Sequence, residues 1–134
     1  MSVTNSAAVA NAMLDAWEAT IGTSAVMKIR TGAAPAHVAN ASTGTVLATF
    51  ALPSDWMAPA SGGSKAKSGT WEDVSADADG TPGHYEITAS DGSTVHERGT
   101  VTITGGGGDM TLNTASLTAG VTVTVTGFTK SMDI

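Results

Sequence analysis

The chain contains no cysteine. This absence excludes disulfides, thiolate metal sites and cysteine nucleophiles together. It leaves the compartment open, because a reducing cytosol and a disulfide-free secreted protein both permit it.

Charged residues are also scarce. They make up 13% of the chain, and 12 acidic residues outnumber 6 basic ones, which gives a formal net charge of −6. Such a chain is poorly suited to neutralise phosphates, so we expect no nucleic acid and no anionic membrane as partner. Small neutral side chains fill the surface instead, and they can be buried against other subunits without desolvating many ions. The composition therefore favours assembly.

Long hydrophobic runs are absent as well. No run approaches the roughly 20 apolar residues that cross a bilayer. The N-terminus lacks the basic start and leucine-rich centre of a signal peptide, so we expect the protein to fold where it is made. The length of 134 residues is typical of one domain, and we predict a single domain over residues 1–134.

The first predicted element is an amphipathic helix over residues 6–21. Asn5 or Ser6 can cap its start, and Gly22 is a plausible stop. Five apolar residues recur at helical spacing and form one stripe: Ala10, Met13, Leu14, Trp17 and Ile21. We expect this stripe to pack on the sheet of the same chain rather than on another subunit.

After Gly22 the pattern changes to short strands separated by turns. Alternation of apolar and polar residues is clear at 25–32, at 45–53 and at 121–128. Roughly seven strands with turns every 8–12 residues are typical of sandwiches and barrels. We therefore predict a mainly β fold, an antiparallel β-sandwich or jelly-roll-like barrel over about 25–130, with one N-terminal α-helix.

The clearest local signal is a β-hairpin over residues 83–105. Asp91-Gly92 predicts a two-residue turn between its strands. The alternation slips at Arg98-Gly99, which predicts a β-bulge there.

Two segments look loosely ordered. The stretch 53–69 is rich in Pro, Gly and Ser, and Trp56 within it is the aromatic residue that we expect to anchor a partner. Trp17 is expected in the core. The run GGGGDM at 105–110 lacks the Lys-Ser/Thr of a phosphate loop and a following helix, and it reads as a slack connection.

One acidic stretch matches part of a calcium-loop pattern. Ser75, Asp77, Asp79, Gly80 and Glu86 fall at positions 1, 3, 5, 6 and 12 of an EF-hand loop, with serine in place of the first aspartate. The flanking segments look like strands rather than helices. We therefore prefer an ordinary acidic turn.

The histidines give no metal-binding spacing. His37, His84 and His96 lie on different segments, and His84 and His96 could meet across the hairpin beside Glu86 or Glu97. No H-x-x-x-H or H-x-H motif supports a zinc site, so we expect surface histidines. No G-x-S-x-G elbow is present. We assign no catalytic, cofactor-binding or metal-binding residue and expect no enzymatic activity.

Several stretches follow one another in a recognisable order. They are NAMLDAW, MKIRTGAAPA, LATFALP, DGTPGHYEITASDGSTVHERGTV and DMTLNTASLTAGVTVTVTGF. Over nearly the whole chain, this succession resembles a family of small structural virion proteins of tailed bacteriophages and prophages. The resemblance implies a part of the virion that is assembled in the bacterial host cytoplasm, with the major capsid protein or other virion proteins as partners.

Within that resemblance we favour a capsid decoration or cement protein that binds the outside of the shell as a homo-oligomer and bridges capsomers. An acidic, neutral-rich surface suits the outside of a capsid better than its DNA-filled inside. The glycine-rich stretches 61–69 and 105–108 and the N-terminal helix are the expected contact elements. Alternatives are a tail, neck or fibre-associated virion protein, or a calcium- or carbohydrate-binding β-sandwich module.

The last strand alternates valine and threonine from Val121 to Thr126. Its period of two places the valines on one face and the threonines on the other. No lysine or proline blocks its edge between Val121 and Phe128, so we predict an edge strand at or near a subunit contact.

Overall fold

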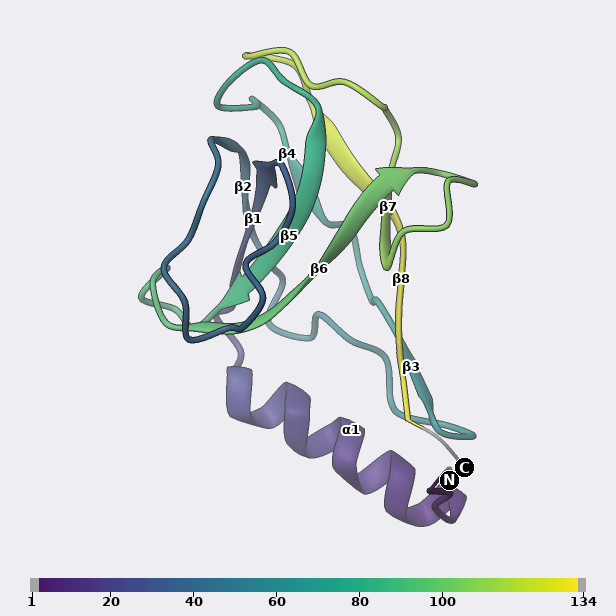
Figure 1. Cartoon of the computed structure of the whole chain (residues 1–134). Coiled ribbons are helices and arrows are strands. Elements are labelled where there is room, and N and C mark those ends of the chain that lie inside the picture. The colour runs from purple at the N-terminus through teal and green to yellow at the C-terminus, as the bar shows by residue number, and fades with distance from the viewer. Residues whose placement is uncertain (1–2, 133–134) are drawn as a thin grey trace.

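The computed structural model describes residues 3–132, in which one helix is followed by eight strands (Figure 1). The elements are α1 (Ala7–Ile21), β1 (Val26–Thr31), β2 (Val46–Ala51), β3 (Ser64–Ala66), β4 (Glu72–Asp73), β5 (Pro82–Thr88), β6 (Val95–Ile103), β7 (Met110–Leu112) and β8 (Val123–Ser131). The predicted class, mainly β with one N-terminal helix, is confirmed.

The strands form one curled sheet in the order β2-β1-β5-β6-β7-β8-β3, and β4 pairs with β8 beside β3. The sheet curves into a half-barrel, and α1 lies beneath its lower end (Figure 1). Every pair in the described residues is antiparallel except β6–β7, which is parallel and makes the sheet mixed.

The helix begins and ends as predicted. The Ser6 hydroxyl accepts from the Val9 N–H at 3.2 Å, and Gly22 ends the helix with a φ of 98°. Ala10 and Leu14 are buried and Ile21 joins the core, whereas Met13 is 43% exposed and departs from the predicted stripe. No helix in residues 3–132 has the length and apolar character to cross a membrane.

Aromatic side chains fill the inside of the half-barrel. Trp56 is fully buried between Trp17 and Trp71, with ring centroids 5.2 and 5.9 Å away, and its indole N–H donates to the Gly22 carbonyl at 3.0 Å. The prediction that Trp56 is an exposed anchor is therefore wrong. So is the expectation of weak order at 53–69, because this segment supplies core residues and forms β3. Irregular backbone carries no periodicity, so its burial leaves no pattern in the sequence.

The predicted edge position of the last strand is also wrong. Strand β8 pairs with β7 on one side and with β3 and β4 on the other. Val123 and Val125 are buried as their alternation predicts, but Val121 precedes the strand and is exposed. Alternation identifies the two faces of a strand but does not predict which strands pair with it.

The turn of the β5–β6 hairpin is longer than predicted. Residues 89–94 connect the two strands, and the Ala89 N–H donates to the Thr94 carbonyl at 3.0 Å. Asp91 organises this loop, because its carboxylate accepts from the backbone N–H groups of Ser93 and Thr94 and from the Thr94 hydroxyl. The Asp91 side chain thus stabilises the connection between the two strands, which a two-residue turn would close with backbone hydrogen bonds alone.

The glycine run between β6 and β7 is a tight crossover rather than a slack connection. Only residues 104–109 link the two parallel strands, where a dozen or more residues are usual. A Cβ on Gly106 would lie 2.7 Å from the Thr102 Cβ, and the Gly108 N–H donates to the Thr102 hydroxyl at 3.0 Å. The loop folds back over Thr102 because its glycines have no side chains.

Gly106→Ala is therefore expected to lower the free energy of unfolding by about 1–3 kcal/mol through overpacking against Thr102. Gly105→Asn is the control in the same loop, because Gly105 has a φ of 87° with open space around it and asparagine tolerates that conformation. Urea unfolding measures both. Equal losses in the two variants would contradict the tight crossover.

The Asp91 loop gives a pH dependence. Hydrogen bonds from the Thr94 hydroxyl and from the backbone N–H groups of Thr94 and Ser93 lower the pKa of Asp91 from 3.8 to about 2. A depressed pKa stabilises the folded state above the unfolded value, and this contribution is lost as the pH falls through the folded value. Wild type should therefore be more stable than Asp91→Asn at pH 7, with the difference disappearing between pH 4 and pH 2. Thermal unfolding across this range measures it, and a constant difference would contradict it.

Candidate functional site

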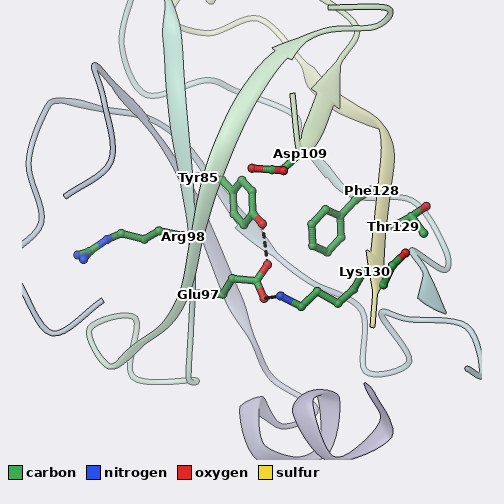
Figure 2. Close-up of a pocket in the computed structure, with 8 residues that line it drawn as sticks. Tyr85, Glu97, Arg98, Asp109, Phe128, Thr129 and Lys130 are labelled. Atoms are coloured by element: carbon green, nitrogen blue, oxygen red, sulfur yellow. Dashed lines mark hydrogen bonds and ion pairs between the residues drawn. The ribbon is translucent and has the colours of Figure 1, made fainter. Parts of the chain in front are cut away.

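A polar pocket lies between β6 and β8, below the short strand β7 (Figure 2). It is a cavity of about 280 Å³, and its inner wall carries Tyr85, Glu97, Phe128 and Lys130. Strands β6 and β8 each have nine residues, whereas β7 has three. The cavity opens where β7 ends and its two neighbours continue.

A chain of polar contacts crosses the cavity. The Tyr85 hydroxyl donates to Glu97 Oε1 at 2.6 Å, and Lys130 Nζ lies 2.9 Å from Glu97 Oε2 (Figure 2). Burial, followed by the negative charge of Glu97, raises the pKa of Tyr85 well above its usual value. The phenol therefore remains a protonated donor, and the carboxylate is satisfied on both oxygens.

Gly99 makes room for this arrangement. It lies opposite Tyr85 in the β5–β6 ladder, and a Cβ there would be 2.6 Å from the tyrosine ring. The predicted bulge at Arg98-Gly99 is wrong, since the register shift lies between Ile87 and Thr88. The slip in alternation at Gly99 reflects a missing side chain rather than an extra residue.

The upper end of the cavity carries an acidic group. Asp109 accepts from the backbone N–H and the hydroxyl of Thr100, both at 3.0 Å. It is exposed and forms no ion pair with any residue in the described part of the chain. This end of the cavity therefore has an uncompensated negative charge.

A fully buried carboxylate lies on the other face of the hairpin. Glu86 contacts Arg30 at 2.7 Å and Arg98 at 3.2 Å and accepts from the Ser42 hydroxyl. Burial alone would raise the pKa of Glu86, but the hydrogen bonds from Arg30, Ser42 and Arg98 outweigh it and hold the pKa below its usual value. Arg98 also donates to three backbone carbonyls of the loop 37–40 and so fixes this loop against the sheet.

The residues of the calcium-loop pattern do not converge. Glu86 is held by the two arginines, Asp77 accepts from the Thr49 hydroxyl, and Asp79 accepts from the Ala119 N–H. Among residues 3–132, no group of three or more histidine, aspartate or glutamate side chains is placed to hold a metal ion.

The histidines are also separate. His84 lies opposite Thr100 in the ladder rather than opposite His96, and His96 lies beside α1. His84 is fully buried, which corrects the expectation of a surface residue, and its Nδ1 lies 2.9 Å from the Gly32 carbonyl oxygen. A histidine on a strand that is covered on both faces has no distinguishing sequence pattern.

Sequence reasoning did not find the Tyr85–Glu97–Lys130 contacts. A signal for the first pair exists, because the two strands of one hairpin bring Tyr85 and Glu97 near each other once the register is known. Lys130 lies 33 residues further along the chain than Glu97, and nothing local predicts that it reaches the same cavity.

Comparison of the chain with protein-family models, with curated proteins and with solved structures gives no match.

Tyr85→Phe tests the polar chain across the cavity. Loss of the hydroxyl leaves one oxygen of a nearly buried carboxylate without its donor, so we expect a loss of about 1–3 kcal/mol in the free energy of unfolding. In a Glu97→Gln background the same change should have a smaller effect. Additive effects in this double-mutant cycle would contradict the coupling.

Proposed function

We propose that this protein is a non-enzymatic structural component of a tailed-phage virion, bound to the outside of the capsid as a homo-oligomeric decoration or cement protein. The supporting observation is how its buried charges are used. Glu86, Glu97 and Lys65 are each held in ion pairs that join segments far apart in the sequence. Such an arrangement suits a scaffold that must keep its shape under load.

The Lys65 pairs illustrate this use of charge. The Nζ of this buried lysine lies 2.7 Å from Asp15 and 2.9 Å from Glu18, so it ties β3 to α1. Desolvation alone would lower the pKa of Lys65, but the hydrogen bonds that it donates to its two carboxylate partners outweigh this effect and raise the pKa. The lysine thus stays charged, and its role is to join two elements.

An exposed apolar pair supports contact with other subunits. Val74 and Val121 are 68% and 55% exposed. They lie on neighbouring segments, because the Thr122 hydroxyl donates to the Val74 carbonyl and the Ala76 N–H donates to the Val121 carbonyl. Side chains of this kind are suited to burial in a subunit contact. The low charge of the surface lowers the desolvation that assembly requires.

The direct test uses particles of the phage or prophage that carries the gene. Particles from a deletion strain are mixed with the purified protein and pelleted, and bound copies are counted per capsid and per isolated tail. We expect saturable binding at hundreds of copies on capsids, weakened by Val121→Asp and unchanged by Val38→Asp, an exposed valine in another loop. A few copies on tails would place the protein there instead. No copies on either, and none in wild-type particles by mass spectrometry, would overturn the proposal.

A further inference from the structure

An open slot lies in the wall of the half-barrel. Strand β7 separates β6 from β8, and where it pairs with both, these two strands are two strand spacings apart, about 10 Å. Below β7 both neighbours continue, as residues 95–100 of β6 and 129–131 of β8. Among the described residues, no strand pairs with either segment on the side facing the other. We call this gap the slot.

Backbone groups on both sides point into the slot. The Thr100 N–H donates to Asp109, on the side of β6 that faces away from β5. Backbone groups of alternate residues in a strand point to the same side, so those of Arg98 also face away from β5 and into the slot. On β8, the Phe128 carbonyl and the Met132 N–H bond to the β3 side. The backbone groups of Thr129 and Ser131 therefore face the slot. Two edges with unpaired donors and acceptors border one gap.

The opposite edge of the sheet differs. At β2 the Thr49 N–H donates to the Asp73 carboxylate at 3.0 Å, and the Leu47 carbonyl accepts from the Asp77 N–H at 2.8 Å. That edge is covered by the chain itself. In the slot, the hydrogen-bonded side chains of Tyr85, Glu97 and Lys130 cover only the inner side. They leave the two strand edges unpaired.

The lower end of the slot meets an apolar cleft. Helix α1 and the start of β6 border a cleft of about 270 Å³. Its lining residues are Met13, Ala16, Trp17, Thr20, Ile21 and His96. The Trp17 indole N–H is buried without a hydrogen-bond partner in the described residues, although a buried donor normally has one. The cleft thus offers space for an apolar side chain.

We propose that the slot binds an extended segment of a partner protein as an added strand. The two unpaired edges fix the backbone conformation of this segment. The cleft at the lower end takes an apolar side chain, and the exposed, unpaired carboxylate of Asp109 at the upper end takes a basic one. His96 and Thr100, which mark these ends, are four residues apart along β6, so a segment with its apolar and basic residues at i and i+4 spans a similar length.

The occupant is a foreign segment rather than a second copy. The chain carries a net charge of −6, and residues 3–6 before α1 contain no basic residue. A second copy, with its net negative charge, would be repelled by Asp109, whereas a basic segment of another protein complements it. The inference deepens the proposed function by naming the contact surface, and it rests on that function only for the identity of the partner.

Synthetic peptides test the slot directly. The probe is Thr-Leu-Thr-Val-Thr-Lys-Thr, together with the reverse order of the same residues, since either strand direction satisfies the edges. Fluorescence anisotropy should show saturable binding of one direction below about 1 mM. Replacing the central valine by proline removes a ladder donor and should weaken binding at least about tenfold. Equal binding of the proline peptide, or no binding in either direction, would overturn the proposal.

Three protein variants locate the binding. Met13→Glu should weaken binding about tenfold or more, because it places a charge in the apolar cleft. Val9→Glu, also an exposed apolar residue of α1 but outside the cleft, is the matched control and should bind as wild type. Asp109→Asn keeps an acceptor for Thr100 and should weaken only the peptide that contains lysine, not one with glutamine there. Equal effects of Met13→Glu and Val9→Glu would contradict the site.

Two readouts separate this inference from the proposed function. Peptide binding should slow amide exchange at Arg98, Thr129 and Ser131. Capsid binding that Met13→Glu does not alter, combined with no peptide binding, would overturn the slot and leave the virion function standing. Peptide binding without particle binding would support the slot and overturn the virion function. Light scattering that shows a dimer lost in Met13→Glu would identify a second copy as the occupant and overturn the choice of a foreign segment.

Discussion

Two glutamates on one hairpin, Glu86 buried and Glu97 nearly so, determine how the rest of the chain is arranged. Glu86 and Glu97 lie on adjacent strands and point to opposite faces of the sheet, and each must be neutralised because an unpaired buried carboxylate is strongly unfavourable. Glu86 draws in Arg30 from β1 and Arg98 from β6. Glu97 accepts a hydrogen bond from Tyr85 and forms an ion pair with Lys130 of β8, on the far side of the half-barrel. The hairpin thus fixes positions on both of its faces.

These pairs specify geometry more than they add stability. A buried ion pair recovers little more than the desolvation of its partners, whereas removing one partner costs about 3–5 kcal/mol. Arrangements that separate Glu86 from its arginines are therefore disfavoured by a large margin. This matters in a chain whose other polar residues are mostly threonine and serine, because their hydroxyls bond equally well to many neighbours. The Thr126 hydroxyl, for example, meets both Thr104 and Thr111.

Sequence reasoning predicted the features that depend on local periodicity. The helix follows from apolar spacing and a serine cap, and the buried face of β1 follows from Met27 and Ile29 alternating with charged residues. The neighbours of β8 could not be predicted, because strand pairing is set by contacts across the whole chain. Trp56 was misjudged for a related reason, since its burial depends on Gly22 and on two other tryptophans from distant segments.

The candidate site was harder still to predict. Gly99 and Gly106 look like ordinary loop or bulge residues until the ring of Tyr85 and the side chain of Thr102 are known to occupy the space beside them. The contact between Glu97 and Lys130 joins two strands that are not adjacent in the sheet. The sequence did indicate the character of the surface, which has few charged residues, most of them acidic, and so few ions to desolvate.

An unpaired strand edge normally invites open-ended pairing and aggregation. The slot avoids this through its geometry, since β7 closes it above and α1 lies beneath its lower end (Figure 1). Only a short segment fits, and once it has bound, both neighbouring edges are paired and nothing remains to extend. The inward-pointing charges of Glu97 and Lys130 act in the same direction, because a purely apolar strand laid over them would desolvate an ion pair. In the binding mode that we propose, such a slot would let a protein with few surface charges pair with one partner segment without presenting an open edge for aggregation.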